Sequence, residues 1–188
     1  MQQNSTKNKS MPVTTLTFIA LFTVLITICS WLSIPITGIP ITMQTFAIFL
    51  TIYLLGPKYS AFSIIVYLIL GAIGLPVFAG FGSGIGYLLG PTGGYLLGFL
   101  GTALIYALFR KLFGKSYISQ IVSSLLGLVT CYALGTAWFI HVYTQTSGSI
   151  SIMATLSMTV FPFVIFDIAK IVIAILLDGR LKRFLPKF

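Results

Sequence analysis

Apolar runs long enough to cross a lipid bilayer recur along the whole chain of 188 residues. The hydrocarbon core of a bilayer is about 30 Å thick, which takes about 20 helical residues to span. The runs are continuous and do not alternate with a period of two, so they predict helices rather than a β-barrel. Because 57% of the residues are hydrophobic and only 7% are charged, no room is left for a soluble domain. We therefore expect an all-α integral membrane protein with multiple membrane crossings.

Six transmembrane helices are predicted from these runs and from the Pro and Gly residues that separate them. Their expected bounds are 14–34, 41–55, 59–76, 92–109, 117–141 and 151–177. Residues 1–13 then form an N-terminal segment, and residues 14–188 form the membrane domain with a short basic tail. The first apolar run is longer than that of a typical signal peptide. We therefore expect it to remain as a helix of the mature protein.

The basic residues predict the orientation, because Lys and Arg in short loops concentrate on the cytoplasmic side. Except for Lys170, all of them fall in the four segments that six crossings place on one side. These are Lys7 and Lys9; Lys58; Arg110, Lys111 and Lys115; and Arg180, Lys182, Arg183 and Lys187. Both termini are therefore predicted to be cytoplasmic. The basic residues form no stripe interleaved with aromatics, so no nucleic acid partner is expected despite the net charge of +9.

Two charged residues, Asp167 and Lys170, lie in the middle of the last predicted span. A charge at the centre of a membrane helix costs roughly 2.5 to 3.5 kcal/mol on insertion, so both side chains should face the bundle interior. Their i, i+3 spacing places them on one face of the helix. The pair either binds a substrate or forms a purely structural ion pair, and intramembrane charges more often mark substrate or ion paths.

The chemistry of this pair suits a small amphiphilic anion with polar N–H or O–H donors, because an ammonium binds carboxylates and a carboxylate accepts hydrogen bonds. The sequence contains neither a carboxylate dyad nor a Ser-His or HExxH arrangement, so we do not expect an enzyme. No phosphate-binding glycine motif and no metal-type spacing is present. No cofactor and no metal are therefore expected.

A glycine-rich stretch, LPVFAGFGSGIGYLLGPTGG, separates the third and fourth predicted spans. Irregular backbone at membrane depth is tolerated only against protein or a cavity. Gly94 and Gly98 form a GxxxG pattern on the fourth span, for which close helix packing is expected. Gln44 and Ser83 are polar groups in the outer half of the bundle, and each either contacts a ligand or satisfies backbone groups.

The residues GAIGLPVFAGFGSGIGYLLGPTGGYLLGF, followed some seventy residues later by FDIAK, resemble the BioY family of biotin transporters. Members of this family are substrate-binding S components of energy-coupling factor (ECF) transporters. The segment ITMQTFAIFLTIYLLGPKYSAF extends the resemblance over about residues 36–177. The resemblance implies a six-helix fold with both termini inside, a multi-pass location in a bacterial cell membrane, and biotin as the transported ligand.

The resemblance also implies which residues hold biotin. The valerate carboxylate is expected to meet Lys170 and the ureido N–H groups to meet Asp167, while the glycine-rich loop lines or covers the pocket. The predicted substrate-binding residues are Asp167, Lys170, Gln44, Gly80, Gly82, Ser83, Gly84 and Tyr87.

The partners that the resemblance implies are an ECF coupling membrane subunit and two ATPase subunits, because the chain carries no ATP-binding motif. S components often present a small-residue A-x-x-x-A pattern on the first helix for docking. Here Ala20 is followed by Val24, which departs from that pattern. Two alternatives stay open: an S component or autonomous carrier for another small vitamin, and a non-transport membrane scaffold in which Asp167 and Lys170 form only a structural pair.

Overall fold

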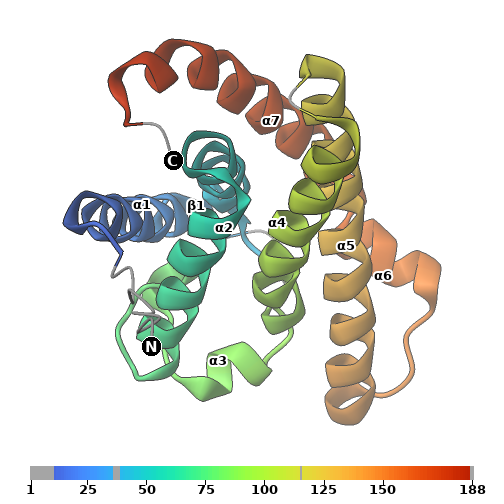
Figure 1. The fold of residues 1–188 in the computed structure, drawn as a ribbon. Helices are drawn as coiled ribbons and strands as arrows, with labels where there is room; N and C mark the ends of the chain where they lie inside the picture. Colours follow the sequence, from blue (N-terminus) through green and yellow to red (C-terminus); the bar gives the residue numbers. More distant parts are fainter. Residues whose placement is uncertain (1–10, 36–38, 115, 187–188) are drawn as a thin grey trace, which may run out of the picture.

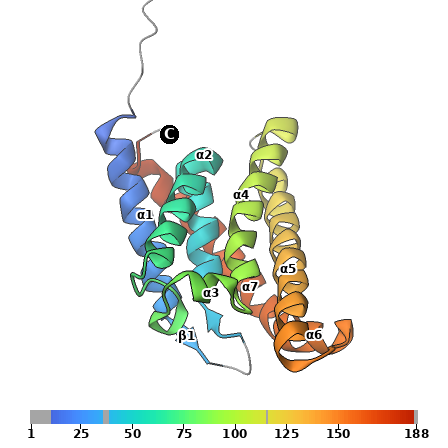
Figure 2. The same ribbon diagram turned by 90° about the horizontal axis from the view of Figure 1, so that it is seen from below.

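The structure is a computed structural model that describes residues 11–35, 39–114 and 116–186. These residues form a bundle of long helices joined by short connections (Figures 1 and 2). The elements are α1 (Val13–Trp31), β1 (Ser33–Ile34), β2 (Ile41–Thr42), α2 (Gln44–Ala72), η1 (Ala79–Phe81), α3 (Ile85–Leu89), α4 (Gly93–Phe113), α5 (Tyr117–Ser147), α6 (Ile152–Thr159), α7 (Phe161–Leu181) and η2 (Lys182–Phe184). Within the described residues, 4 helices are long and apolar enough to cross a membrane, or 5 if α6 and α7 count as one bent span.

Helix α2 is folded back on itself at Gly56, which has φ 75° and ψ 167°. The side chain of Gln44 donates a hydrogen bond of 2.6 Å to the hydroxyl of Tyr67, although the two lie 23 residues apart. In a straight helix they would be about 35 Å apart at a rise of 1.5 Å per residue. Residues 44–55 and 57–72 are therefore two antiparallel helical segments. The turn predicted at Gly56-Pro57-Lys58 is confirmed, and the positive φ there favours glycine.

A two-residue strand pair replaces the ends of two predicted helices. Ser33 pairs with Thr42 and Ile34 with Ile41 in an antiparallel ladder, whereas 14–34 and 41–55 were expected to be helical throughout. The chain leaves the helix here because a residue that precedes proline, as Ile34 does, is disfavoured in the helical region. The third predicted span also ends early, at Ala72 instead of residue 76.

The packing of α4 against α5 rests on glycines in both helices. A Cβ atom on Gly94 would lie 2.2 Å from the Cβ of Trp138, and one on Gly98 would lie 3.0 Å from the Cα of Cys131. On α5, Gly135 makes room for the ring of Tyr95, which a Cβ would approach to 2.2 Å. The close helix packing predicted for the GxxxG pattern is confirmed.

The last predicted span, 151–177, is broken into α6 and α7, which are bent by 42°. The break lies at Val160, whose φ of −126° and ψ of −57° leave the helical region. Pro162 follows in the first turn of α7, where its missing N–H is tolerated. Helix α7 then runs to the end of the bundle where α1 begins, opposite the end that holds α3 and α6 (Figure 2).

We call the end of the bundle where α1 begins the basic end. The turn within α2 and the C-terminal ends of α4 and α7 lie there (Figure 2), and these segments contain Lys58; Arg110 and Lys111; and Arg180, Lys182 and Arg183. A Cβ atom on Gly56 would lie 3.7 Å from the guanidinium of Arg110, so the α2 turn and the end of α4 meet there. We call the opposite end, with β1, β2, α3 and α6, the loop end. The remaining basic residues of the orientation argument, Lys7, Lys9, Lys115 and Lys187, lie outside the described residues, as does most of the predicted N-terminal segment 1–13.

Candidate functional site

The two charges of α7 face the interior of the bundle, as predicted. Asp167 is 4% exposed and Lys170 is 6% exposed. The ammonium of Lys170 donates to Oδ1 of Asp167 at 2.8 Å. One helical turn thus brings the two groups together, as the i, i+3 spacing requires.

Two further elements hold this pair in place. The ammonium of Lys170 also donates to the carbonyl oxygen of Thr42 in β2, at 2.8 Å. The hydroxyl of Tyr132 in α5 donates to Oδ2 of Asp167, at 2.7 Å. An ammonium has three donors and a carboxylate about four acceptor positions. Lys170 therefore keeps one N–H, and Asp167 keeps acceptor capacity, beyond their contacts with the described residues.

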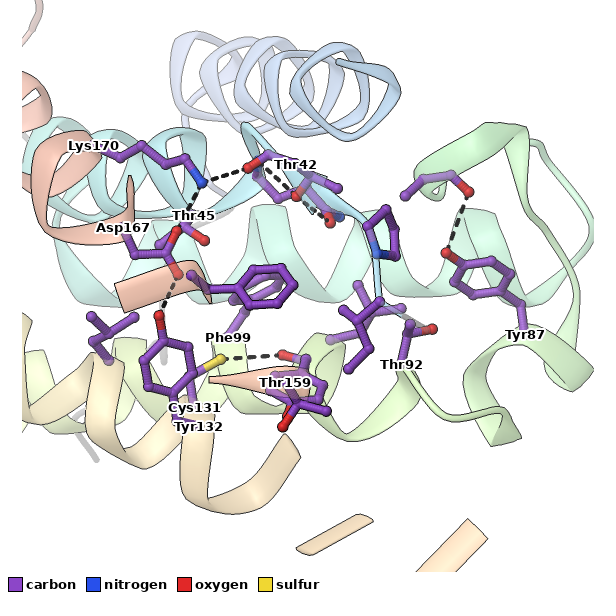
Figure 3. Close-up of a pocket in the computed structure, with 18 residues that line it drawn as sticks. Thr42, Thr45, Tyr87, Thr92, Phe99, Cys131, Tyr132, Thr159, Asp167 and Lys170 are labelled. Atoms are coloured by element: carbon purple, nitrogen blue, oxygen red, sulfur yellow. Dashed lines mark hydrogen bonds and ion pairs between the residues drawn. The ribbon is translucent and has the colours of Figure 1, made fainter. Parts of the chain in front are cut away.

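Both charged side chains line a cavity of about 70 Å³ at the meeting of α2, α4, α5 and α7. Figure 3 shows Asp167 and Lys170 at one end of the cavity and Tyr87 and Thr92 at the other. Apolar side chains, among them Phe99, form the wall between. The other lining residues that carry a hydroxyl or an amide are Thr42, Gln44, Thr45, Tyr95, Tyr132 and Thr159. Hydrogen-bonding groups thus lie at both ends of the cavity, and the wall between them includes the apolar ring of Phe99.

Gln44 lines this cavity and connects it to the core of the bundle. Its Oε1 accepts from the hydroxyl of Thr42 at 3.1 Å, and its Nε2 donates to the hydroxyl of Tyr67 at 2.6 Å. Tyr67 packs edge-on against Phe78, with ring centroids 5.4 Å apart. Gln44 therefore fixes the strand residue whose carbonyl holds Lys170, and one of its N–H donors remains for another partner.

Of the predicted loop contacts, Tyr87 lines the cavity. Its hydroxyl donates to the carbonyl of Ala79 at 3.3 Å, and its ring stacks on Phe78 at 5.0 Å between centroids. Burial raises the pKa of Tyr87, partly opposed by a hydrogen bond with the Thr92 side chain. At neutral pH the hydroxyl is therefore protonated and able to donate.

The other four predicted loop residues, Gly80, Gly82, Ser83 and Gly84, do not line the cavity. Gly80 and Gly84 have positive φ values of 64° and 86°, and Ser83 is exposed. A Cβ atom on Gly82 would lie 2.3 Å from the ring of Tyr87. In this structure, the glycines shape the loop and seat Tyr87 instead of reaching the cavity themselves.

Sequence reasoning did not single out Tyr132, Thr42 or Thr92 as parts of the site. Tyr132 offers a signal, because a tyrosine hydroxyl in the middle of a membrane helix needs a hydrogen-bond partner. Thr42 contributes its backbone carbonyl, which no residue type reveals. Cys131 also lines the cavity.

Sequence reasoning also gave no role to Asp178. This residue is 6% exposed and pairs with Lys182 at the basic end, away from the cavity just described. Among the described residues, no group of three or more His, Cys, Asp or Glu side chains is placed to hold a metal ion. The chemistry of the site is therefore that of one ion pair, several hydroxyls and an amide.

Comparison with known proteins identifies relatives that match most of this chain. A family model described as the BioY family matches residues 1–187. The chain is 40% identical over 163 residues to a biotin transporter BioY of Thermotoga maritima, covering 87% of this chain and 92% of the relative. It is 37% identical over 164 residues to a probable biotin transporter BioY of Pyrococcus horikoshii, covering 87% and 93%.

A solved structure has the same fold. It is the crystal structure of the S-component for biotin from an ECF-type ABC transporter, with a TM-score of 0.82 and 30% sequence identity. The similarity covers 95% of this chain and 97% of that chain.

Proposed function

The chain belongs to the BioY family, and from this we propose that it is the substrate-binding membrane subunit for biotin uptake in a bacterial cell membrane. Relatives named as biotin transporters support this assignment. They also support a transport role in place of an enzymatic one. The observation that carries the proposal is the buried Asp167–Lys170 pair, which keeps unused hydrogen-bond capacity and lines a cavity.

We propose six membrane crossings: α1, the two halves of α2, α4, α5, and α6 with α7 as one bent span. The backward fold of α2 at Gly56 supports two crossings where one continuous helix is assigned. Lys and Arg side chains gathered at the basic end support its placement in the cytoplasm. With that orientation both termini are cytoplasmic, and the cavity opens toward the outer, loop end.

The geometry of the pair favours a compact ligand group that has a donor and an acceptor side by side. The ammonium of Lys170 and Oδ1 of Asp167 are only 2.8 Å apart, so the two ends of an extended ligand do not both fit there. A ureido group carries N–H beside C=O. We propose that its N–H groups donate to Asp167 and its carbonyl accepts from Lys170, which refines the expectation that Lys170 meets the carboxylate.

The valerate carboxylate then extends to the opposite end of the cavity. The hydroxyls of Tyr87 and Thr92 lie there (Figure 3), and Thr92 is the residue before the first turn of α4. The positive end of a helix dipole and hydroxyl donors both favour an anion. Between the ends, Phe99 and its apolar neighbours suit the hydrocarbon part of biotin.

Uptake against a gradient needs energy that this chain does not supply. The similar protein of known structure is an S-component from an ECF-type ABC transporter. We propose that this chain likewise works with a coupling membrane subunit and two ATPase subunits. Ala20 and Val24 are both exposed on α1, so this face is available for docking although Val24 departs from the small-residue pattern.

Equilibrium binding of biotin to the purified chain in nanodiscs tests the proposal. We expect tight, saturable binding, and weaker binding of biotin methyl ester, which lacks the charged carboxylate. Replacing the ureido oxygen by an imino group, which is protonated to a guanidinium at neutral pH, should weaken binding further, because a guanidinium has no acceptor for Lys170. If the folded chain fails to bind biotin, the ligand is wrong. Equal affinity for all three compounds would refute the assigned contacts.

A further inference from the structure

A second cavity, of about 330 Å³, lies at the basic end between α4, the first turns of α5 and the end of α7. It shares no lining residue with the biotin cavity. The lining residues that carry its chemistry are Tyr106, Arg110, Ser119, Gln120, Asp178 and Lys182. The proposed function makes no use of this cavity.

The charges in this cavity do not cancel. Both carboxylate oxygens of Asp178 accept from the ammonium of Lys182, at 3.2 and 3.0 Å. Arg110 forms no ion pair or hydrogen bond with any other described residue. The Asp178–Lys182 pair is neutral as a unit, so the cavity carries one uncompensated positive charge from the guanidinium.

Two hydroxyls that line this cavity also lack partners among the described residues. Tyr106 is 7% exposed and Ser119 is 8% exposed, and neither hydroxyl makes a hydrogen bond within the described part of the chain. Neither oxygen is sealed off, since the described residues contain no fully buried side-chain N or O atom without a partner. Both hydroxyls are therefore accessible to a partner inside the cavity. Together with Arg110, they present three kinds of donor to whatever enters the cavity.

Exposed apolar side chains flank the part of this cavity's lining that joins α4 to α5. Phe113, Tyr117 and Ile118 flank the turn between α4 and α5 and are 64%, 72% and 75% exposed. Side chains of this kind suit the boundary between lipid headgroups and acyl chains, where aromatic residues are enriched. Of these three residues, Tyr117 lines the cavity itself, which places this side of the cavity next to the lipid interface.

We propose that this cavity binds the phosphate group of an anionic phospholipid in the leaflet at the basic end. Arginine matches phosphate by charge and by its fork of N–H donors. Basic pockets between membrane helices are known to hold lipid headgroups in this way. The first turn of α5, whose residues Tyr117 and Ser119 line the same cavity, adds to the positive potential.

Native mass spectrometry of the detergent-solubilised chain tests this, using phosphatidylglycerol and phosphatidylcholine with identical acyl chains. We expect preferential retention of phosphatidylglycerol. Arg110→Gln should reduce that retention about tenfold, the effect of losing a charged hydrogen bond. The matched control is Lys111→Gln, which removes an exposed charge next to it on α4 and should leave retention nearly unchanged. Tyr106→Phe should weaken retention less than Arg110→Gln.

Retained biotin binding shows that each variant is folded. Equal losses in Arg110→Gln and Lys111→Gln would overturn the proposal, because they would indicate general attraction to positive charge. Equal retention of the two lipids by the wild type would overturn it as well. A competition arm with inorganic phosphate separates the sources: resistance of bound lipid to millimolar phosphate supports the phospholipid, whereas ready displacement would assign the site to free phosphate and reject the lipid.

Discussion

Two Asp–Lys pairs, one within α7 and one where α7 meets η2, look alike in sequence and differ in their surroundings. In the Asp167–Lys170 pair, the side chains are 6% and 8% exposed. In the Asp178–Lys182 pair, the aspartate side chain is just as buried, at 8%, but the lysine is 54% exposed. The burial of the cation therefore distinguishes the two pairs.

This difference distinguishes a buried ion pair that is held by further hydrogen bonds from an ion pair whose lysine is solvated. A lysine that is half exposed keeps most of its hydration, and such pairs are worth about 0 to 1 kcal/mol. A fully buried pair must be held by additional hydrogen bonds, because the desolvation of both charges is severe. Thr42 and Tyr132 supply them for Asp167 and Lys170. Additional hydrogen bonds thus hold the pair that lines the proposed biotin cavity.

The largest effect is expected from Asp167→Asn, which leaves the ammonium of Lys170 buried without its counter-charge. Breaking a buried pair in this way costs about 3 to 5 kcal/mol, and the ligand also loses an acceptor. We expect biotin affinity to fall by about 100-fold or more at 1.4 kcal/mol per factor of ten, measured by equilibrium binding. Asp178→Asn is the matched control and should leave affinity within about twofold, since it breaks a pair whose lysine is solvated. Similar losses in both variants would remove the distinction between the pairs.

The double variant Asp167→Asn/Lys170→Gln separates ligand binding from stability. Removing both charges leaves no buried unpaired ion, so its thermal midpoint should recover most of what Asp167→Asn loses. Biotin binding should stay lost, because the site has lost its charged partners. Recovery of binding along with stability would indicate that the pair is purely structural. Exchanging the two residues, which keeps the net charge, should likewise fold without binding.

Tyr132→Phe should have a smaller effect, because it removes only the hydroxyl that holds Oδ2 of Asp167. A hydrogen bond to a charged group contributes about 1.5 to 3 kcal/mol, so we expect biotin affinity to fall about tenfold with the fold retained. Tyr143→Phe on the same helix is the control, since Tyr143 is not among the residues that line the cavity. Unchanged affinity in Tyr132→Phe would show that the tyrosine does not position the carboxylate.

The smallest effect is expected on the stability of the second pair. Lys182→Gln should change the free energy of unfolding by less than about 1 kcal/mol, measured by chemical denaturation in detergent. High salt should weaken the wild-type pair and shrink even this difference, because exposed charges are screened. A loss as large as that of Asp167→Asn would mean that the exposed lysine is far more constrained than its solvation implies.

Much of this architecture could be predicted from hydrophobicity and charge. The apolar runs, the breaks at Gly56 and in the glycine-rich loop, and the inward direction of Asp167 and Lys170 follow from the cost of placing polar groups in lipid. The close α4–α5 contact follows from the spacing of Gly94 and Gly98. These features depend on single segments or on one pair of helices.

The features that the sequence did not predict depend mainly on contacts between segments that are separated along the chain. Nothing local marks the carbonyl of Thr42 as the partner of Lys170. No glycine marks the break at Val160. Pro162 indicates a kink nearby, but it does not identify the residue at which the helix breaks. From the sequence, Ser33–Ile34 is predicted to be the end of an apolar helix, and only its pairing with Ile41–Thr42 identifies it as a strand. Of the eight predicted binding residues, Asp167, Lys170, Gln44 and Tyr87 line the cavity, and their contact with biotin remains a prediction.

The hydrogen bond from Lys170 to Thr42 spans 128 residues of chain, and this bears on how the protein is made. A ribosome delivers α1 through α5 to the membrane before it has synthesised α7, so the nascent protein holds a nearly complete bundle without its charged pair. The i, i+3 contact lets Asp167 and Lys170 enter the bilayer already paired with each other. Their docking against Thr42 and Tyr132 is then the closing step of assembly, and a chain that is cut short before α7 never forms the cavity.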